Sequence, residues 1–531
     1  MNTAVGRNAM YTNVNGDRNV AIGDNALYTM NPSSDSDTNN VAVGKNAMYN
    51  TTTGTLNTAV GYNVMEANTT GAENVAIGNL ALDANTTGGE NTAVGCHAMG
   101  ANTTASYNTA VGGQALTDNT TGAANVALGY KALANNTTAS ANVAIGREAM
   151  LTNITGHTCT AIGDKALRTM DAAYYNVAVG YYTLYNCTTG SRNVSVGNES
   201  SKAVTTGNDN IGIGYEALAA NSTGNSNTAV GKDALQFNNG NGNTAIGAFA
   251  MEDATTAATN VAVGYYALGE AACSAMDCVA VGAHAAEDVT TGSYTVAVGR
   301  NAGRSITTGQ RNTVVGHDAA TAMTTSGMNT LIGNRAMISG SGDNNVMVGK
   351  SAGEDGSYDA SGNTFVGYYA GNSATTGGNN ICLGQSANKS AVDSSNQVTL
   401  GNSNIGTLRC QVTSITALSD ERDKTDIIDL PLGLDFLNTI RPVKFTWKHR
   451  EPVPSKDGTS KAGFIAQELD KAQKDAGVKD YMKLVLDNNP DKLEASAGHL
   501  LPVMVQAIKE LSTKNDELAA EIASLKSQIN N

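Results

Sequence analysis

"NTAVGYNVMEANTTGAENVAIG", residues 57–78, decides the fold of most of this chain. Its pentad "NTAVG" returns as "NVAIG" after 17 residues, and 24 glycines of this kind run from Gly6 to Gly401. Departures from the step are small, and the largest is the insertion "NPSSDSDTNN" at 31–40. A fixed period of this length is typical of a repeat architecture, in which each copy packs on its neighbours.

Each copy carries the pattern of short β-strands. Bulky and small side chains alternate in the pentad, as in Val41, Ala42 and Val43. Three residues past the glycine comes Ala in 20 of the 24 copies, usually followed by Leu or Met, and a turn cluster such as "NTTG" ends the copy. We expect two strands and two turns per copy, with the small Ala face open to close approach by another surface. Because 17 residues cannot enclose a core, we predict a mainly β fold, a parallel β-roll or β-solenoid over 1–405.

The pattern changes near residue 282. From Gly282 onward, the position that held Leu or Met usually holds Ala or Gly, as at Ala286 and Gly353. Since the second strand loses a bulky side chain, we expect a change of cross-section there. The recurrent "NTT" and "NST" triplets are interpreted as turns rather than glycosylation sites.

Composition excludes several classes of function. The net charge of −14 without clustered Lys or Arg argues against nucleic-acid binding. No long apolar run predicts membrane insertion, and no signal-peptide pattern predicts export. The seven cysteines contain no CxxC pair, so we expect buried free thiols, no zinc site, no other metal and no cofactor.

The repeats resemble two known families. They are similar to the head repeats of trimeric autotransporter adhesins and to the shaft repeats of bacteriophage tail fibres. The resemblance implies that three chains wind together, with the small-residue face near the threefold axis. The adhesins carry an export signal and a C-terminal membrane barrel, and neither is found in this sequence. The phage version is therefore favoured.

A second kind of sequence follows residue 416. Residues 417–531 hold 16 Lys and Arg and 19 Asp and Glu, against 17 and 28 in everything before. A strand is predicted at Val443–Trp447, "KAGFIAQELDKAQ" predicts a strand or turn leading into a helix, and Pro502 suits the first turn of a long last helix. The pattern is that of a small α+β domain.

The last helix, 501–529, has the spacing of a coiled coil. Its predicted seam consists of Leu501, Met504, Ile508, Leu511, Asn515, Leu518, Ile522, Leu525 and Ile529. Ile at the a positions, Leu at d and one Asn at a favour two strands. This conflicts with the three chains that the repeat resemblance implies.

The C-terminal sequence "SDERDK", "TDI", "LNTIRPVKFTW", "GFIAQEL" and "LLPVMVQAIKEL" resembles the intramolecular chaperone domain of phage endosialidases, tailspikes and neck appendages. The resemblance implies that 419–531 helps the fibre to trimerise and fold, and then cuts itself off before Ser419. The cut bond would join Leu418 to Ser419, with 406–418 as the linker. Ser419 would be the nucleophile and Lys424 its base, and Asp420 and Arg422 are further motif positions.

The implied chemistry constrains the local structure. A serine hydroxyl becomes a useful nucleophile when a neighbour takes its proton, and a lysine can do so only when neutral. Residues five apart lie about 140° apart on a helix, so the chain must bend between Ser419 and Lys424, or a neighbouring protomer must supply one of them. Alternatively, Ser419 and Asp420 only open a helix or turn. Asp423 stands where the family commonly has an apolar residue, and a carboxylate there would favour a charged Lys424.

The function expected first is that of a structural and host-binding phage tail fibre or appendage. It would be a homotrimer in the virion, made in the host cytoplasm, and would contact other tail or baseplate proteins. A host surface glycan is a candidate partner, stacked on tyrosines after the pentad glycine, although the simpler interpretation, which we favour at this point, is that these rings only cover the roll. The tyrosines are Tyr130, Tyr181, Tyr182, Tyr265, Tyr266, Tyr368 and Tyr369. Enzyme activity would at most be one self-cleavage per chain. The alternatives are a polysaccharide depolymerase, which needs two facing carboxylates, and an exported bacterial trimeric adhesin.

Overall fold

The structure is a computed structural model, and it describes residues 1–270, 272–354, 359–373, 375–405, 408–409, 419–446, 460–487 and 493–530. The chain divides into two compact units, Met1–Tyr358 and Asp359–Asn531. Trp447, Cys410 and Leu418 lie outside the described residues.

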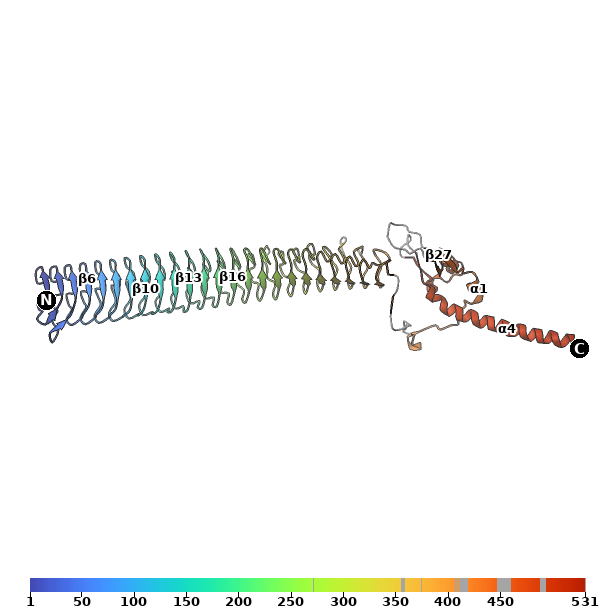
Figure 1. The fold of residues 1–531 in the computed structure, drawn as a ribbon, viewed down its shortest axis with the longest axis horizontal. Coiled ribbons are helices and arrows are strands. Elements are labelled where there is room, and N and C mark those ends of the chain that lie inside the picture. Colours follow the sequence, from blue (N-terminus) through green and yellow to red (C-terminus); the bar gives the residue numbers. More distant parts are fainter. Residues whose placement is uncertain are drawn as a thin grey trace. The chain divides into compact units, whose positions relative to one another are not determined.

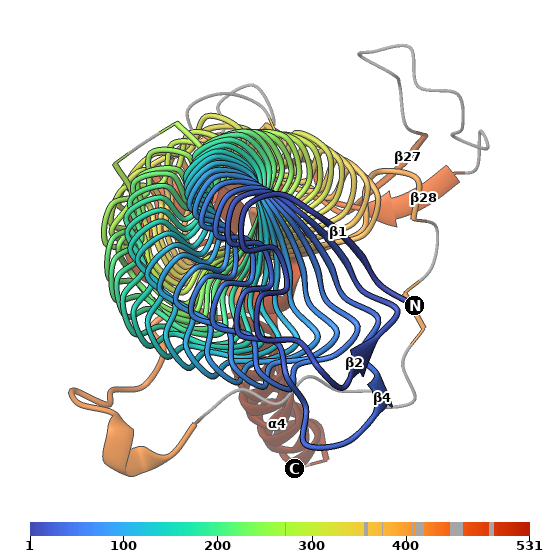
Figure 2. The ribbon, with the colours of Figure 1, turned by 90° about the vertical axis from the view of Figure 1, so that its left-hand side faces the viewer.

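One three-residue strand per repeat builds a 24-stranded parallel sheet. Consecutive strands pair in register, so that Ala42 lies beside Ala59 in the next copy. Figure 1 shows the strands of the first unit following one another, one per coil, and in Figure 2 these coils overlie one another with a steady rotation. The predicted parallel β-solenoid with 17-residue repeats is confirmed.

The strands of this sheet are β1 (Thr3–Val5), β3 (Val20–Ile22), β5 (Val41–Val43), β6 (Thr58–Val60), β7 (Val75–Ile77), β8 (Thr92–Val94), β9 (Thr109–Val111), β10 (Val126–Leu128), β11 (Val143–Ile145), β12 (Thr160–Ile162), β13 (Val177–Val179), β14 (Val194–Val196), β15 (Ile211–Ile213), β16 (Thr228–Val230), β17 (Thr244–Ile246), β18 (Val261–Val263), β19 (Val279–Val281), β20 (Val296–Val298), β21 (Thr313–Val315), β22 (Thr330–Ile332), β23 (Val346–Val348), β24 (Thr364–Val366), β25 (Ile381–Leu383) and β26 (Val398–Leu400). A small second sheet pairs β2 (Gly16–Asp17) with β4 (Ser36–Asp37).

The side chain at the centre of a strand, which is small in most copies, faces the inside of its own coil. Ala59 is fully buried, as are Val64 and Met65, which follow the glycine in the same coil. The bulky strand residues on either side point outward and remain partly exposed. The expectation that the small-residue face packs against other chains is therefore wrong, because the same chain's own bulky side chains already cover it.

Among the described residues of the repeats, the second predicted strand of each copy does not form. Asn63 and Met65 have φ angles of 48° and 51°, which belong to the left-handed region rather than to extended backbone. The segment still joins the next coil, because the Met65 amide donates to the Ala81 carbonyl oxygen at 3.0 Å. Apart from the first coils, which also contribute β2 and β4, a typical coil thus has one strand and one ladder of tight turns.

Two columns of buried asparagine lie inside the solenoid, a longer one that includes Asn91 and a shorter one from Asn68 to Asn153, and neither was recognised from sequence. In one column, Asn91 Nδ2 donates to Asn74 Oδ1 at 3.1 Å and to the Ala105 carbonyl oxygen at 2.9 Å. In the other, Asn85 Nδ2 donates to Asn68 Oδ1 at 2.9 Å. These ladders satisfy amides and carbonyls inside the coil, where an unpaired polar group would cost stability.

In several copies after residue 282, the larger side chain lies on the strand of the coil rather than on its turn side. Where the second side has Gly353, the strand has Met347, and a Cβ added at Gly353 would lie 2.3 Å from the Met347 sulfur. Likewise, a Cβ at Gly371 would lie 2.1 Å from a Phe365 ring carbon. In these two copies the strand residue takes up the volume that the turn residue leaves, whereas beside Gly303 the strand still has Ala297 and the Ile306 side chain fills the space. The change of cross-section near residue 282 stays a prediction.

The pentad glycine is required by the spacing of the coils. Gly112 has a φ of +136°, and a Cβ on it would lie 2.6 Å from the carbonyl oxygen of Gly129. The next residue, Gly113, has no such constraint, since its Cβ would meet only a Tyr130 ring carbon at 3.7 Å. The same close approach of backbone recurs at the pentad glycines of other coils.

We expect Gly112→Ala to destabilise the solenoid by about 1 to 3 kcal/mol, because the new methyl group combines a strained φ with a clash against backbone. Gly113→Ala is the matched control and should leave stability unchanged or slightly raised. Thermal unfolding followed by circular dichroism measures both. Equal unfolding temperatures for the two variants would contradict the assignment.

Most cysteines are buried thiols, as predicted, but Cys96 is exposed. Burial raises the pKa of Cys187 to about 12 and that of Cys273 to about 11. Both thiols therefore stay protonated near neutral pH and are poor nucleophiles.

The C-terminal part is the predicted small α+β domain. Its elements are η1 (Glu421–Asp423), α1 (Leu434–Asn438), β27 (Val443–Thr446), β28 (Ser460–Gly463), α2 (Ala466–Asp475), α3 (Lys479–Met482), β29 (Val485–Leu486), β30 (Glu494–Ala495), η2 (Ala497–Leu500) and α4 (Leu501–Ile529). Strands β27 and β28 are antiparallel, as are β29 and β30. Phe436, Leu469, Leu484 and Val503 belong to its core. In the described part of the chain, no helix combines the length and the hydropathy that a bilayer crossing requires.

Candidate self-cleavage site

A short 3-10 helix shapes the segment that follows residue 418. Asp420 caps η1, because its Oδ1 accepts the backbone N–H of Arg422 at 2.9 Å. The Arg422 side chain folds back on the same carboxylate, with Nε 3.0 Å from Oδ1. This contact holds the pKa of Asp420 below its ordinary value. The two motif positions therefore stabilise one tight turn.

That turn brings the predicted nucleophile and base together. Lys424 leaves η1 in an extended conformation, with its N–H donating to the Glu421 carbonyl oxygen at 3.1 Å. Its Nζ then reaches back and lies 2.6 Å from Ser419 Oγ. It also lies 3.4 Å from the Ser419 carbonyl oxygen. The chain bends between the two residues, so a single protomer can supply both.

The contact has the geometry that proton transfer needs. With a charged lysine, Nζ–H donates to Oγ, whereas with a neutral lysine the same 2.6 Å contact lets Oγ–H donate to Nζ. Ser419 and Lys424 are both exposed. Leu418, on the other side of the predicted cut bond, lies outside the described residues, and of Asp423 the structure gives only its place at the end of η1.

The comparisons with known proteins point to this same segment. Residues 419–478 match the family model for the chaperone of endosialidase. The match begins at Ser419, the residue predicted to follow the cut. No curated protein and no solved structure matches the chain.

The predicted coiled-coil seam lies on one helix and is unpartnered within the described residues of a single chain. All nine seam residues are in α4. The apolar members are about half exposed or more, from Met504 at 47% to Ile529 at 82%. An adjacent face of the helix supplies Val503 and Ala507, which are buried. The helix therefore joins its own domain by one face and leaves the seam open.

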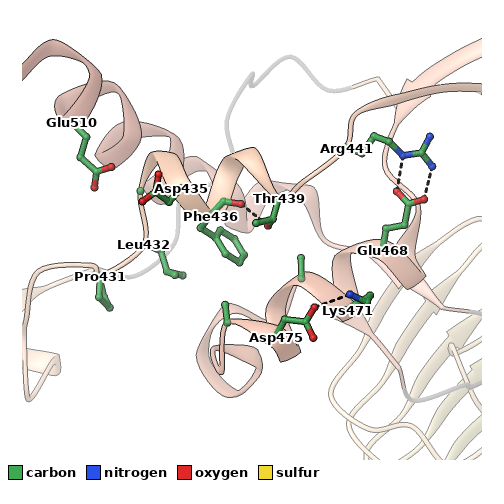
Figure 3. A pocket seen from close by; sticks show the side chains of 13 residues that line it. Pro431, Leu432, Asp435, Phe436, Thr439, Arg441, Glu468, Lys471, Asp475 and Glu510 are labelled. Atoms are coloured by element: carbon green, nitrogen blue, oxygen red, sulfur yellow. Dashed lines mark hydrogen bonds and ion pairs between the residues drawn. The ribbon is translucent and has the colours of Figure 1, made fainter. Parts of the chain in front are cut away.

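A pocket of about 890 Å³ opens between α1, α2 and α4 in the same domain (Figure 3). Arg441 and Glu468 pair across it, with Arg441 Nε 3.1 Å from Glu468 Oε2, and this contact lowers the pKa of Glu468. Glu510 accepts the Leu434 N–H at 2.8 Å and so satisfies the start of α1. The polar groups along this pocket thus serve the packing of the domain.

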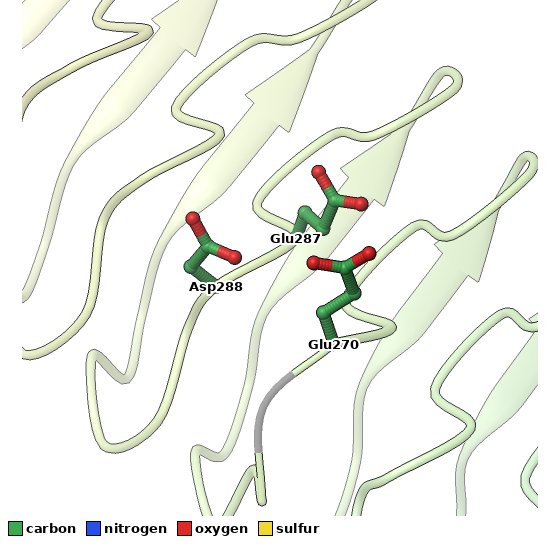
Figure 4. A group of neighbouring side chains, drawn as sticks. All are labelled: Glu270, Glu287 and Asp288. Atoms are coloured by element: carbon green, nitrogen blue, oxygen red, sulfur yellow. The ribbon is translucent and has the colours of Figure 1, made fainter.

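One cluster of carboxylates lies in the solenoid. Oxygens of Glu270, Glu287 and Asp288 are within 4.8 Å of one another (Figure 4). Glu287 is fully buried, but its two oxygens pair with His284 and Arg304. Its charge is therefore balanced by protein groups, and it is not free to act as the acid or base of glycoside hydrolysis. We assign neither a metal site nor a catalytic role to this cluster.

Proposed function

We propose that this chain is a structural and host-binding virion protein of the phage tail fibre or tailspike-like kind. It is made in the host cytoplasm, assembles as a homotrimer with other tail or baseplate proteins, and is folded by its C-terminal domain. That domain then releases itself by one cleavage before Ser419. The observation that carries the proposal is the contact between Ser419 and Lys424 at the first residue of the matching segment. A β-solenoid followed by such a domain fits this class of protein.

The outer face of the solenoid sheet supports self-association. Each strand presents two side chains outward, and in β15 these are Ile211 and Ile213, which are 37% and 39% exposed. In the other strands the counterparts of Ile213 are Val, Ile or Leu, and those of Ile211 are Val, Ile or Thr, so one apolar column and one mixed column run along the sheet. A continuous exposed apolar surface of this kind marks an interface. A second copy of the chain fits it best, because it presents the same columns at the same spacing.

The open seam of α4 supports association at the C-terminal end. Its heptads taken alone favour two strands, whereas the solenoid resemblance implies three. We propose three, since the outward sheet columns extend over 24 strands whereas the seam lies on one helix.

The molar mass in solution tests the proposal. The Ser419→Ala chain, which should stay whole, should have three times the 54.4 kDa mass of one chain. The mass of two chains would favour the two-stranded interpretation, and the mass of a single chain would contradict the proposal.

Charges on the outer sheet face should prevent this assembly. In the double variant Ile211→Lys with Ile213→Lys, the coil stays intact because both side chains point outward, but ammonium groups from each chain would be buried together at the interface. We expect light scattering to show monomers. Thr206→Lys, at an exposed turn of a neighbouring coil, should leave the trimer unchanged.

A further inference from the structure

Four aromatic rings gather on three consecutive coils of the first unit. Phe249 and Tyr266 are stacked with ring centroids 4.7 Å apart, and His284 continues the stack at 5.9 Å. Tyr265 stands nearly perpendicular to them, with its centroid 4.7 Å from that of Tyr266. We call these four residues the aromatic patch. Its rings hold one another in place, so a ligand that stacks on them need not order them first.

The patch is accessible in the chain. Tyr265 is 48% exposed. It follows β18 directly, after Gly264, on the outside of the coil. Gly269 leaves the Tyr266 ring clear, because a Cβ there would lie 2.9 Å from a carbon of that ring. An exposed ring face of this type suits the C–H face of a sugar ring.

Polar groups border the patch. Lys232 Nζ lies 4.4 Å from the Phe249 ring centroid and 2.7 Å from Asp233 Oδ2. The other oxygen of this carboxylate, Oδ1, is buried and has no hydrogen-bond partner among the described residues. On the far side, His284 Nδ1 pairs with Glu287. Aromatic surface beside a few fixed polar groups is the usual composition of a small-ligand site.

The charge around the patch selects among glycans. Among the described residues around the patch, both side-chain cations are already paired, Lys232 with Asp233 and Arg304 with Glu287. The carboxylates of Glu252 and Glu270 remain, and burial, together with neighbouring acidic groups, raises the pKa of each. An acidic sugar would therefore meet like charge without a free cation, whereas the hydroxyl and amide groups of a neutral sugar would meet acceptors.

We propose that the aromatic patch is a binding site for an uncharged glycan, with Tyr265 as the stacking ring. The inference rests on the proposed host-binding function and makes it specific, since it names the class of receptor and excludes sialylated chains.

The test uses the full-length protein on three immobilised probes, a glucose heptasaccharide, an N-acetylglucosamine hexasaccharide and an α2,8-linked sialic acid oligomer. We expect binding to at least one neutral probe and none to the sialic acid oligomer. Tyr265→Ala should weaken that binding about tenfold through loss of one stacked ring. Tyr294→Ala is the matched control, because Tyr294 is 49% exposed outside the patch, and should bind like the wild type.

The proposal is overturned if no neutral probe binds, if the sialic acid oligomer is preferred, or if the two tyrosine variants bind alike. Light scattering on Tyr265→Ala completes the test. A variant that remains assembled while losing the glycan supports a ligand site, whereas one that dissociates would place Tyr265 in the subunit interface and overturn the proposal. Loss of a trimer in the wild type would count against the proposed assembly instead.

Discussion

The purified wild-type protein should separate on a denaturing gel into two fragments, residues 1–418 and residues 419–531, whereas Ser419→Ala should migrate as one whole chain. The nucleophilic oxygen is absent from this variant, so the bond before Ser419 cannot be attacked by it. Lys424→Arg should also stay whole, because a guanidinium keeps its charge and cannot accept the serine proton. N-terminal sequencing of the smaller wild-type fragment should read Ser-Asp-Glu-Arg.

A serine elsewhere in the domain provides the control. Ser496 precedes η2, and Ser496→Ala should be cut as the wild type is. Both serine variants should fold, since Ser419 is exposed and the core around Phe436 and Leu469 is unchanged. If the wild type remains whole after assembly, the contact between Ser419 and Lys424 is structural, and the catalytic assignment is withdrawn.

The rate of release gives a graded test of the lysine. A lysine accepts a proton only when neutral, so release should become faster as the pH rises. Asp423→Leu removes a negative charge beside Lys424 in sequence, which should make the neutral amine easier to form and speed release at a given pH. A rate that does not depend on pH would contradict the role of Lys424 as base.

Much of the shaft could be predicted because its signal is repeated. A period of 17 residues with alternating bulky and small side chains specifies one strand per coil, and stacking is the only way for so short a unit to bury them. The direction in which the small residues point was predicted wrongly. Alternation alone says that Ala59 and Val60 face opposite ways, but not which side is the inside. The inside is decided by whether Met65 of the same coil can reach the Ala. It can, because residues before and at Met65 adopt left-handed conformations, which no strand pattern contains.

The asparagine ladders show a different limit. Asn74 and Asn91 recur one period apart and could have been recognised as a column, but asparagine beside threonine and glycine also indicates a turn. Sequence alone does not distinguish an amide that caps its own turn from one that bonds to the coil beside it.

At the candidate site, by contrast, the motif itself contained the residues that shape the local structure. The spacing of Ser419 and Lys424 required a bend, and the Asp420 and Arg422 positions that make this bend were already in the motif.

Removing residues 419–531 from the gene should leave the shaft largely unassembled. The outward columns of the sheet repeat Val, Ile and Thr with little variation, so in the proposed trimer chains that slip by one coil would lose few contacts, and many registers would have nearly equal free energy. The seam of α4 differs, because a single polar residue, Asn515, interrupts its apolar positions and penalises a shifted alignment. We expect size-exclusion chromatography of the truncated product to show aggregates and monomers.

The comparison is informative because the same fragment can be made in two ways. Residues 1–418 produced by release from the full chain should remain a soluble trimer after the C-terminal domain is removed, while residues 1–418 translated alone should not form one. The two samples have identical sequence, so a difference between them reflects folding history rather than the contacts of the final state. The C-terminal domain can then be released after assembly without loss of the trimer, since a register between chains that is fixed once is held by every strand pair along the sheet. Soluble trimers from the truncated gene, with the unfolding temperature of the released shaft, would show that the solenoid finds its own register and would remove the need for a chaperone.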